Sequence, residues 1–169
     1  MASSLRRTLV LQIRCATCIQ ILTLYFIHIS NILQAMKTAS ENQTARFAPI
    51  MYMKNVADAV EFYKKAFDVK ELRLFKNDDG SIHVAELMIQ DAIFHLHEET
   101  GNKKQLSPGT LNGTCVIIGL FVENPDELFD KAVAAGASIT HPMQDYEYGY
   151  RQGDIIDPFG HHWTIEKKI

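Results

Sequence analysis

Histidine, threonine and glutamate side chains alternate with apolar residues in two short runs of the chain. His95 and His97 lie in one run, and His162, Thr164 and Glu166 lie in another near the C-terminus. Residues i and i+2 of an extended strand point to the same side, so each run presents its polar groups on one face. Imidazole and carboxylate groups can bind a divalent metal ion. A histidine can also act as a general base near neutral pH.

The residues before the first run predict a strand, a helix and three further strands. Residues 46–53 form a short apolar run, and Asn55 and Asp58 have the spacing of a helix N-cap and its third residue. The helix continues with apolar residues on one face. Strands are then expected at 69–76, 82–89 and 92–98, joined by the turns Asn77–Gly80 and Gln90-Asp91.

The second half of the chain repeats this order of elements. After a polar linker, Asn124-Pro125 supplies an N-cap and a first-turn proline, and Gly136 ends the helix. The expected elements are a strand at 114–122, a helix at 126–135 and strands at 137–141, 150–156 and 162–167. The turn before the last strand is Asp-Pro-Phe-Gly, residues 157–160.

A shift of 69 residues aligns the two halves without gaps at their strand–helix starts, and it places His97 on Glu166. The chain is therefore predicted to be a tandem βαβββ duplication of the α+β class. Neither half can bury both faces of its own sheet, so we expect the halves to share one cup-shaped mixed sheet with the helices outside. The predicted boundaries are 46–99 for the first module, 100–113 for the linker and 114–169 for the second module.

Several motifs in this order resemble the vicinal oxygen chelate superfamily, which includes glyoxalase I, bleomycin-resistance proteins and extradiol dioxygenases. Within it, the chain is most similar to the PhnB-like subgroup. The motifs are Ala59-Val60-Glu61-Phe62-Tyr63, Ala85-Glu86-Leu87, residues 131–137, Tyr148-Gly149-x-Arg151-x-Gly153, and Asp157-Pro158-Phe159-Gly160-His161-x-Trp163. The resemblance covers about residues 47–168. It implies the cup-shaped fold and a homodimer.

The resemblance also implies where a metal would bind. Family members that use a metal place four ligands on the inner face of the cup, at positions that correspond here to Ala48, His95, Ile117 and Thr164. Alanine and isoleucine have no donor atom, and a threonine hydroxyl is a poor ligand, whereas a divalent site needs at least three suitable donors. The usual metal site is therefore predicted to be absent, and glyoxalase I activity with it.

The leading hypothesis is thus a protein that binds a small, largely apolar molecule in the cup without a metal cofactor. The predicted pocket residues are Tyr52, His95, His97, Phe121, Tyr148, Arg151, His162, Thr164 and Glu166. Arg151 either pairs with an anionic group of the ligand or forms an ion pair with Asp154 or Asp157. Trp163 has the opposite strand parity and is expected to pack under the helices.

An alternative hypothesis is an enzyme, a lyase or a dioxygenase, with a shifted divalent-metal site. His95, His97 and Glu166 would hold Ni, Zn or Mn there. The plainer interpretation is that the two histidines are hydrogen-bonded and half-exposed, and that Glu166 is a solvated residue near the chain end. The sequence leaves open whether the protein is an enzyme.

The charge and the composition limit the classes of partner that we expect for this protein. The chain has a net charge of −3, but residues 1–40 carry four basic and no acidic residues, so the remainder has a net charge of −7. An acidic body argues against nucleic acid as a partner. Three cysteines do not form a disulfide framework, and Cys15-Ala-Thr-Cys18 is an isolated pair.

Residues 1–45 are expected to lie outside the fold. The segment from Cys15 to Met36 has no charged residue and follows three arginines, which is typical of a signal anchor or a targeting peptide. Polar residues interrupt its apolar run, and Met36 is a plausible natural start. We therefore expect an upstream extension or a dispensable leader and a cytoplasmic protein, with a membrane-anchored or organelle-targeted protein as the alternative.

Overall fold

The structure is a computed structural model that describes residues 46–101 and 104–169, and Phe47–Ile169 form one compact unit. The expectations for residues 1–45, including the leader, the anchor and the Cys15–Cys18 pair, lie outside the described residues. Within the described part of the chain, no helix is long and apolar enough to cross a membrane.

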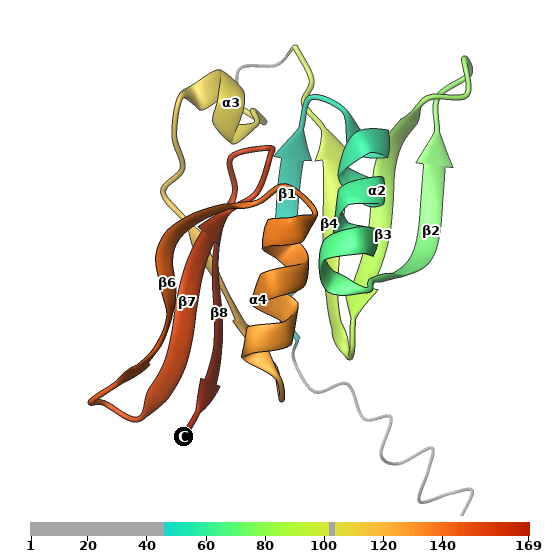
Figure 1. Cartoon of the computed structure of the whole chain (residues 1–169). Helices are drawn as coiled ribbons and strands as arrows, with labels where there is room; N and C mark the ends of the chain where they lie inside the picture. Colours follow the sequence, from blue (N-terminus) through green and yellow to red (C-terminus); the bar gives the residue numbers. More distant parts are fainter. Residues whose placement is uncertain (1–45, 102–103) are drawn as a thin grey trace, which may run out of the picture. The chain divides into compact units, whose positions relative to one another are not determined.

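The first module (residues 46–99) contains four strands and one helix (Figure 1). They are β1 (Ile50–Met53), α2 (Val56–Phe67), β2 (Lys70–Lys76), β3 (Ile82–Ile89) and β4 (Ala92–Glu98). The strands form one sheet in the order β1-β4-β3-β2, with β1 parallel to β4 and the other pairs antiparallel.

Helix α2 begins where the sequence predicts. The Asn55 side chain accepts a hydrogen bond from the backbone N–H of Asp58 at 3.2 Å, which satisfies one of the unpaired donors of the first turn. The apolar face of α2, including Val60, Tyr63 and Phe67, is buried. This face packs on β3 and β4.

The second module (residues 114–169) repeats this arrangement. It contains β5 (Ile117–Phe121), α4 (Pro125–Ala134), β6 (Ser138–Tyr146), β7 (Tyr150–Ile156) and β8 (His162–Lys168), with the sheet order β5-β8-β7-β6. Gly136 has a φ of 119°, so glycine follows α4 where the left-handed backbone requires it. The linker contains a single helical turn, α3 (Pro108–Leu111).

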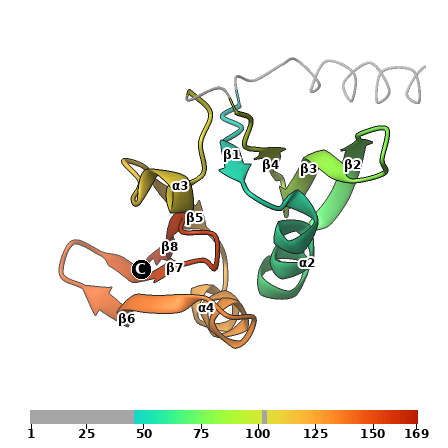
Figure 2. The same ribbon diagram turned by 90° about the horizontal axis from the view of Figure 1, so that it is seen from above.

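The predicted α+β fold of two βαβββ modules is present, but the strands are hydrogen-bonded as two separate four-stranded sheets and not as one. Figure 2 shows each helix beside its own sheet. Helices α2 and α4 also contact each other. The apolar sides of the modules therefore meet through their helices, whereas a continuous sheet would require strand pairing between the modules.

One buried carboxylate joins the two modules. The hydroxyl of Tyr63 in α2 donates a hydrogen bond to Asp157 Oδ2, in the turn between β7 and β8, at 2.5 Å. The ring of Trp163 donates to the same oxygen at 3.0 Å and packs edge-on against Phe67. Burial, followed by the neighbouring Asp157, holds the pKa of Tyr63 well above its usual range, so this hydroxyl remains a donor.

Candidate functional site

The face of each sheet that points away from its helix is the candidate site, and we call it the open face of that module. On β4, Phe94 and Leu96 are buried towards α2, whereas His95 and His97 are only partly buried on the other side. On β8, Trp163 and Ile165 are buried in the same way. This alternation confirms the strand parity predicted for β4 and β8. The open faces carry Tyr52, His95 and His97 in module 1, and Phe121, His162, Thr164 and Glu166 in module 2.

Three aromatic side chains lie together on the open face of module 1. Tyr52 and His97 are opposite each other on the parallel strands β1 and β4, and their rings meet edge to face at 5.8 Å. The rings of His95 and His97 lie 6.2 Å apart. Burial, followed by the neighbouring His95 and His83, lowers the pKa of His97 below its ordinary value, so the uncharged ring predominates at neutral pH.

Glu86 is the acidic group beside this histidine pair. It lies opposite His95 across β3 and β4, and opposite Arg73 across β2 and β3. The closest contact between the Arg73 guanidinium and the Glu86 carboxylate is 3.8 Å, and the guanidinium also lies over the Phe75 ring. The carboxylate is thus directed to the arginine. No hydrogen bond joins a carboxylate to His95 or His97 in the described part of the chain, so a histidine–carboxylate base is not formed there.

The open face of module 2 is polar at its centre. Thr164 donates a hydrogen bond to Asp154 at 2.7 Å across β7 and β8, and His141 Nδ1 lies 3.0 Å from the other oxygen of Asp154. Glu166 lies one strand step further along β8. Burial, followed by the nearby charge of Asp154, raises the pKa of Glu166.

Aromatic rings lie beyond this polar centre, at the end of the sheet that contains Glu166 and Lys168. Phe121 and Tyr150 meet edge to face at 6.0 Å, and Tyr150 lies 5.7 Å from Tyr148. Tyr148 stacks on Tyr146 at 5.0 Å and donates a hydrogen bond to Gln152. We call Phe121, Tyr146, Tyr148 and Tyr150 the aromatic rim of module 2. Burial, and then the neighbouring Tyr146 and Glu166, raises the pKa of the Tyr148 hydroxyl.

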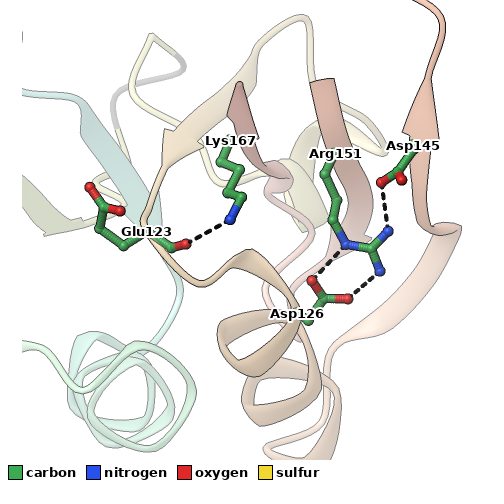
Figure 3. A network of polar contacts seen from close by, with 5 residues as sticks. All are labelled: Glu123, Asp126, Asp145, Arg151 and Lys167. Carbon is green, nitrogen blue, oxygen red and sulfur yellow. Dashed lines mark hydrogen bonds and ion pairs between the residues drawn. The ribbon is translucent and has the colours of Figure 1, made fainter. Parts of the chain in front are cut away.

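Arg151 is not on an open face, contrary to the pocket prediction. It has the same strand parity as Gly153 and Ile155, so it lies on the side of β7 that faces α4. Its guanidinium forms a two-point contact with the carboxylate of Asp126 in α4, and Nη1 lies 2.7 Å from Asp145 Oδ1 in β6 (Figure 3). The predicted partners Asp154 and Asp157 are therefore also wrong. The Arg151 hydrogen bond lowers the pKa of Asp126, and the group ties α4 to its sheet.

The Asp-Pro-Phe-Gly turn has a structural role. Besides Tyr63 and Trp163, the Asp157 carboxylate accepts hydrogen bonds from the backbone N–H groups of Phe159 and His161, both at 2.9 Å. The His161 ring lies 3.2 Å from the carbonyl oxygen of Tyr52. Trp163 packs under the helices, as predicted.

The residues at the family's metal positions do not fit a metal ion, because Ala48 and Ile117 provide no donor atom. The alternative site is not brought together within one chain either. Among residues 46–101 and 104–169, no three His, Cys, Asp or Glu side chains are grouped so that they could bind a metal ion. His95 and His97 belong to the sheet of module 1, and Glu166 belongs to the sheet of module 2.

Two hollows lie near the ends of the sheets, and the first includes two open-face residues of module 2, Phe121 and Lys168. One, of about 340 Å³, is lined by Gln90, Phe121, Val122, Glu123, Lys167 and Lys168. The other, of about 230 Å³, lies between the end of α2 and the start of α4. Of the predicted pocket residues, Phe121 alone lines either of these two hollows. In the described chain, no hydrogen bond, ion pair or ring contact joins the predicted pocket side chains of module 1 to those of module 2.

Sequence reasoning missed the residues that β2, β3, β6 and β7 contribute to the open faces. Asp154, Gln152 and Tyr150 share the parity of the open face on β7. His141 joins them only because the irregular strand β6 places it opposite Asp154. Alternation along residues 150–156 could have found the β7 residues. The register shifts of β6 have no signal in a single sequence.

Comparison with known proteins establishes the family. The family model described as "Glyoxalase/Bleomycin resistance protein/Dioxygenase superfamily" matches residues 43–165. The chain belongs to this superfamily. An uncharacterised protein of Mycobacterium tuberculosis is 33% identical over 135 residues, which cover 78% of this chain and 79% of that protein.

Solved structures agree with this assignment. TioX from Micromonospora sp. ML1 is 26% identical, with a TM-score of 0.61, and the match covers 75% of this chain and 100% of TioX. A gene product of Arabidopsis thaliana is 25% identical, with a TM-score of 0.58 and the same coverage of both chains. The vicinal oxygen chelate fold expected from the sequence motifs is therefore confirmed.

Proposed function

We propose that this superfamily member binds a small, largely apolar molecule on its open faces and that a second copy of the chain completes the cup. The observation that carries the proposal is the exposure of large apolar side chains beside polar groups on these faces. Ile50 is 55% exposed, Ile117 64% and Phe121 60%. Apolar side chains exposed on a concave or sheet surface favour a ligand or a partner there.

The same exposure supports the proposed homodimer. The described chain forms two separate sheets, and no hydrogen bond, ion pair or ring contact joins the predicted pocket side chains of one to those of the other, so a cup lined by both modules would need module 1 of one copy and module 2 of another. Sedimentation equilibrium should give a dimer. Ile117→Asp, which places a charge on the exposed face, should shift it towards monomer, whereas the same change at Leu111 in α3 should not. A wild-type monomer at all concentrations would contradict the dimer.

Ligand binding is tested with quinoline, an uncharged aromatic probe, by NMR titration of the full chain. Chemical-shift changes should concentrate on the open faces. Phe121→Ala should weaken binding about fivefold, because a buried aromatic contact contributes about 1 kcal/mol. Leu111→Ala is the matched control, since Leu111 is equally exposed but lies in α3. Binding that depends equally on both residues would contradict a site on the open face.

Binding of a divalent metal ion is tested by a separate measurement. Ni, Zn and Mn titrations should show no stoichiometric site, because two of the four family ligand positions provide no donor atom. A stoichiometric metal that is lost in His95→Ala, His97→Ala and Glu166→Gln would instead favour the lyase or dioxygenase hypothesis. Such a site would require two copies to bring these residues together.

A further inference from the structure

The Glu166 carboxylate has no ion-pair partner among the described residues of module 2. The other carboxylate on this open face, Asp154, is engaged by both His141 and Thr164. Within residues 104–169, no hydrogen bond or ion pair engages the Glu166 carboxylate. Lys168 lies two residues further along the same side of β8 and is exposed at the end of the strand. It makes no ion pair with Glu166.

Gly119 leaves room for this carboxylate. It lies on β5 opposite Thr164, and a Cβ atom added there would be 3.3 Å from Glu166 Oε1. The carboxylate therefore lies over a strand that has no side chain at this point. At the equivalent position, module 1 has Ile50, opposite His95 on β4. Module 2 thus has a carboxylate over a glycine where module 1 has an isoleucine side chain.

The aromatic rim adds the second half of a recognition site. Phe121 lies directly opposite Glu166 across β5 and β8, and Tyr150 packs against Phe121. Tyr148 is 61% exposed, as Phe121 is at 60%, so both rings have surface available for a ligand. Aromatic rings attract cations through their negative faces and also stack on flat ligands.

We propose that the open face of module 2 selects an organic cation with a flat aromatic part. The aromatic part would stack on the rim at Phe121 and Tyr148, and the positive charge would lie beside Glu166 over Gly119. This inference rests on the proposed function, because it names the chemical class of the ligand for that same surface. A neutral or anionic aromatic molecule would leave Glu166 without an opposite charge in a partly desolvated site.

The test compares two probes with the same ring system at neutral pH, N-methylquinolinium and uncharged quinoline. In NMR titrations of the full chain, N-methylquinolinium should bind about tenfold more tightly, as expected for one cation–π contact combined with one ion pair. Glu166→Gln should reduce this preference to about threefold or less. Glu61→Gln, which neutralises an exposed carboxylate in α2, should leave the preference unchanged.

Each other outcome has a definite meaning. If quinoline binds as tightly as N-methylquinolinium, or if the preference survives Glu166→Gln, the cation inference is overturned while the proposed function stands. If neither probe binds, the proposed function fails as well. If Mn²⁺ displaces N-methylquinolinium from wild-type protein but not from Glu166→Gln, the surface is a metal-ion site, and the organic cation is overturned.

Discussion

Modules 1 and 2 place different chemistry at equivalent positions of one backbone plan. The row formed by His95, Glu86 and Arg73 in module 1 corresponds to Thr164, Asp154 and His141 in module 2, and both rows end in an acid–base pair across two strands. The duplication therefore preserves the pairing pattern of the sheet.

The next row along the sheets shows where the modules differ. Tyr52 and His97 in module 1 correspond to Phe121 and Glu166 in module 2. An uncharged imidazole beside a phenol can donate and accept hydrogen bonds, whereas a carboxylate beside a phenyl ring favours a cation. The fold thus fixes the positions of these side chains, and the residues at the two equivalent positions decide the chemistry of each face.

The turns before β4 and β8 should show the largest difference between the modules. Asp157→Ala in the β7–β8 turn removes the acceptor of four hydrogen bonds, two of them from the buried Tyr63 and Trp163. We expect a loss of about 3–5 kcal/mol in the free energy of unfolding, because buried donors are left unpaired. Urea unfolding followed by tryptophan fluorescence measures it.

The β3–β4 turn of module 1 provides the control. Asp91 is exposed, and its side chain accepts no hydrogen bond in the described residues, so Asp91→Ala should change stability by less than about 0.5 kcal/mol. Tyr63→Phe, which removes one of the four hydrogen bonds, should cost about 1–2 kcal/mol. Equal effects of Asp157→Ala and Asp91→Ala would show instead that the two turns contribute equally to stability.

Helix–sheet packing should give the next largest effect. Gly153 in β7 faces Phe129 in α4, and the equivalent residues in module 1 are Ala85 and Val60. A Cβ atom at Gly153 would lie 2.7 Å from a ring carbon of Phe129 and 3.1 Å from the Cα of Met143. Gly153→Ala should therefore destabilise the protein by about 1–3 kcal/mol through overpacking.

Adding Phe129→Val to Gly153→Ala, which gives module 2 the alanine and valine found in module 1, should restore part of the lost stability. Phe129→Val alone leaves a cavity and should cost about 1–3 kcal/mol. In the double variant the new methyl group occupies part of that space. The loss of stability should therefore be smaller than the sum of the two single losses by about 1 kcal/mol. A double-mutant cycle from urea unfolding measures this coupling. Strictly additive losses would mean that the ring of Phe129 is not what restricts residue 153.

Local patterns predicted the elements and the strand faces well, because alternation and helix capping depend on neighbouring residues. Asn55 caps α2, and His95 and His97 share one face of β4, as the sequence indicates. The prediction for Arg151 was wrong although a strand was expected at residues 150–156, because the side of that strand that faces α4 was not assigned. In a strand, Arg151 must point to the side opposite Gln152 and Tyr150.

Contacts between distant segments were not predictable in the same way. The pairing of Asp157 with Tyr63 joins residues 94 positions apart, and no local pattern encodes it. Strand β6 extends to Tyr146, beyond the expected end at residue 141, even though it contains Pro142. An edge strand tolerates proline because one of its sides needs no hydrogen-bond donor, and the register shifts of β6 allow the strand to continue.

The smallest predicted effect is an opposite pH dependence of the two open faces. The pKa of His97 is lowered on folding, so the unfolded state binds a proton more readily, and acidification below about 6.5 removes stability. The pKa of Glu166 is raised on folding, so the folded state binds the proton more readily. Its contribution is therefore unfavourable at neutral pH and is relieved as the pH falls through the folded pKa.

Substitution at these two equivalent positions should separate the contributions. His97→Gln should reduce the loss of stability on acidification, whereas Glu166→Gln should raise stability at neutral pH and make that loss steeper. Because both side chains are partly exposed, we expect changes of about 0.5 kcal/mol or less. Urea unfolding of the three proteins at several pH values between neutral and mildly acidic measures the difference. If both variants shift the pH profile in the same direction, the modules do not differ in charge chemistry at this row, and the cation selectivity inferred for module 2 loses its electrostatic basis.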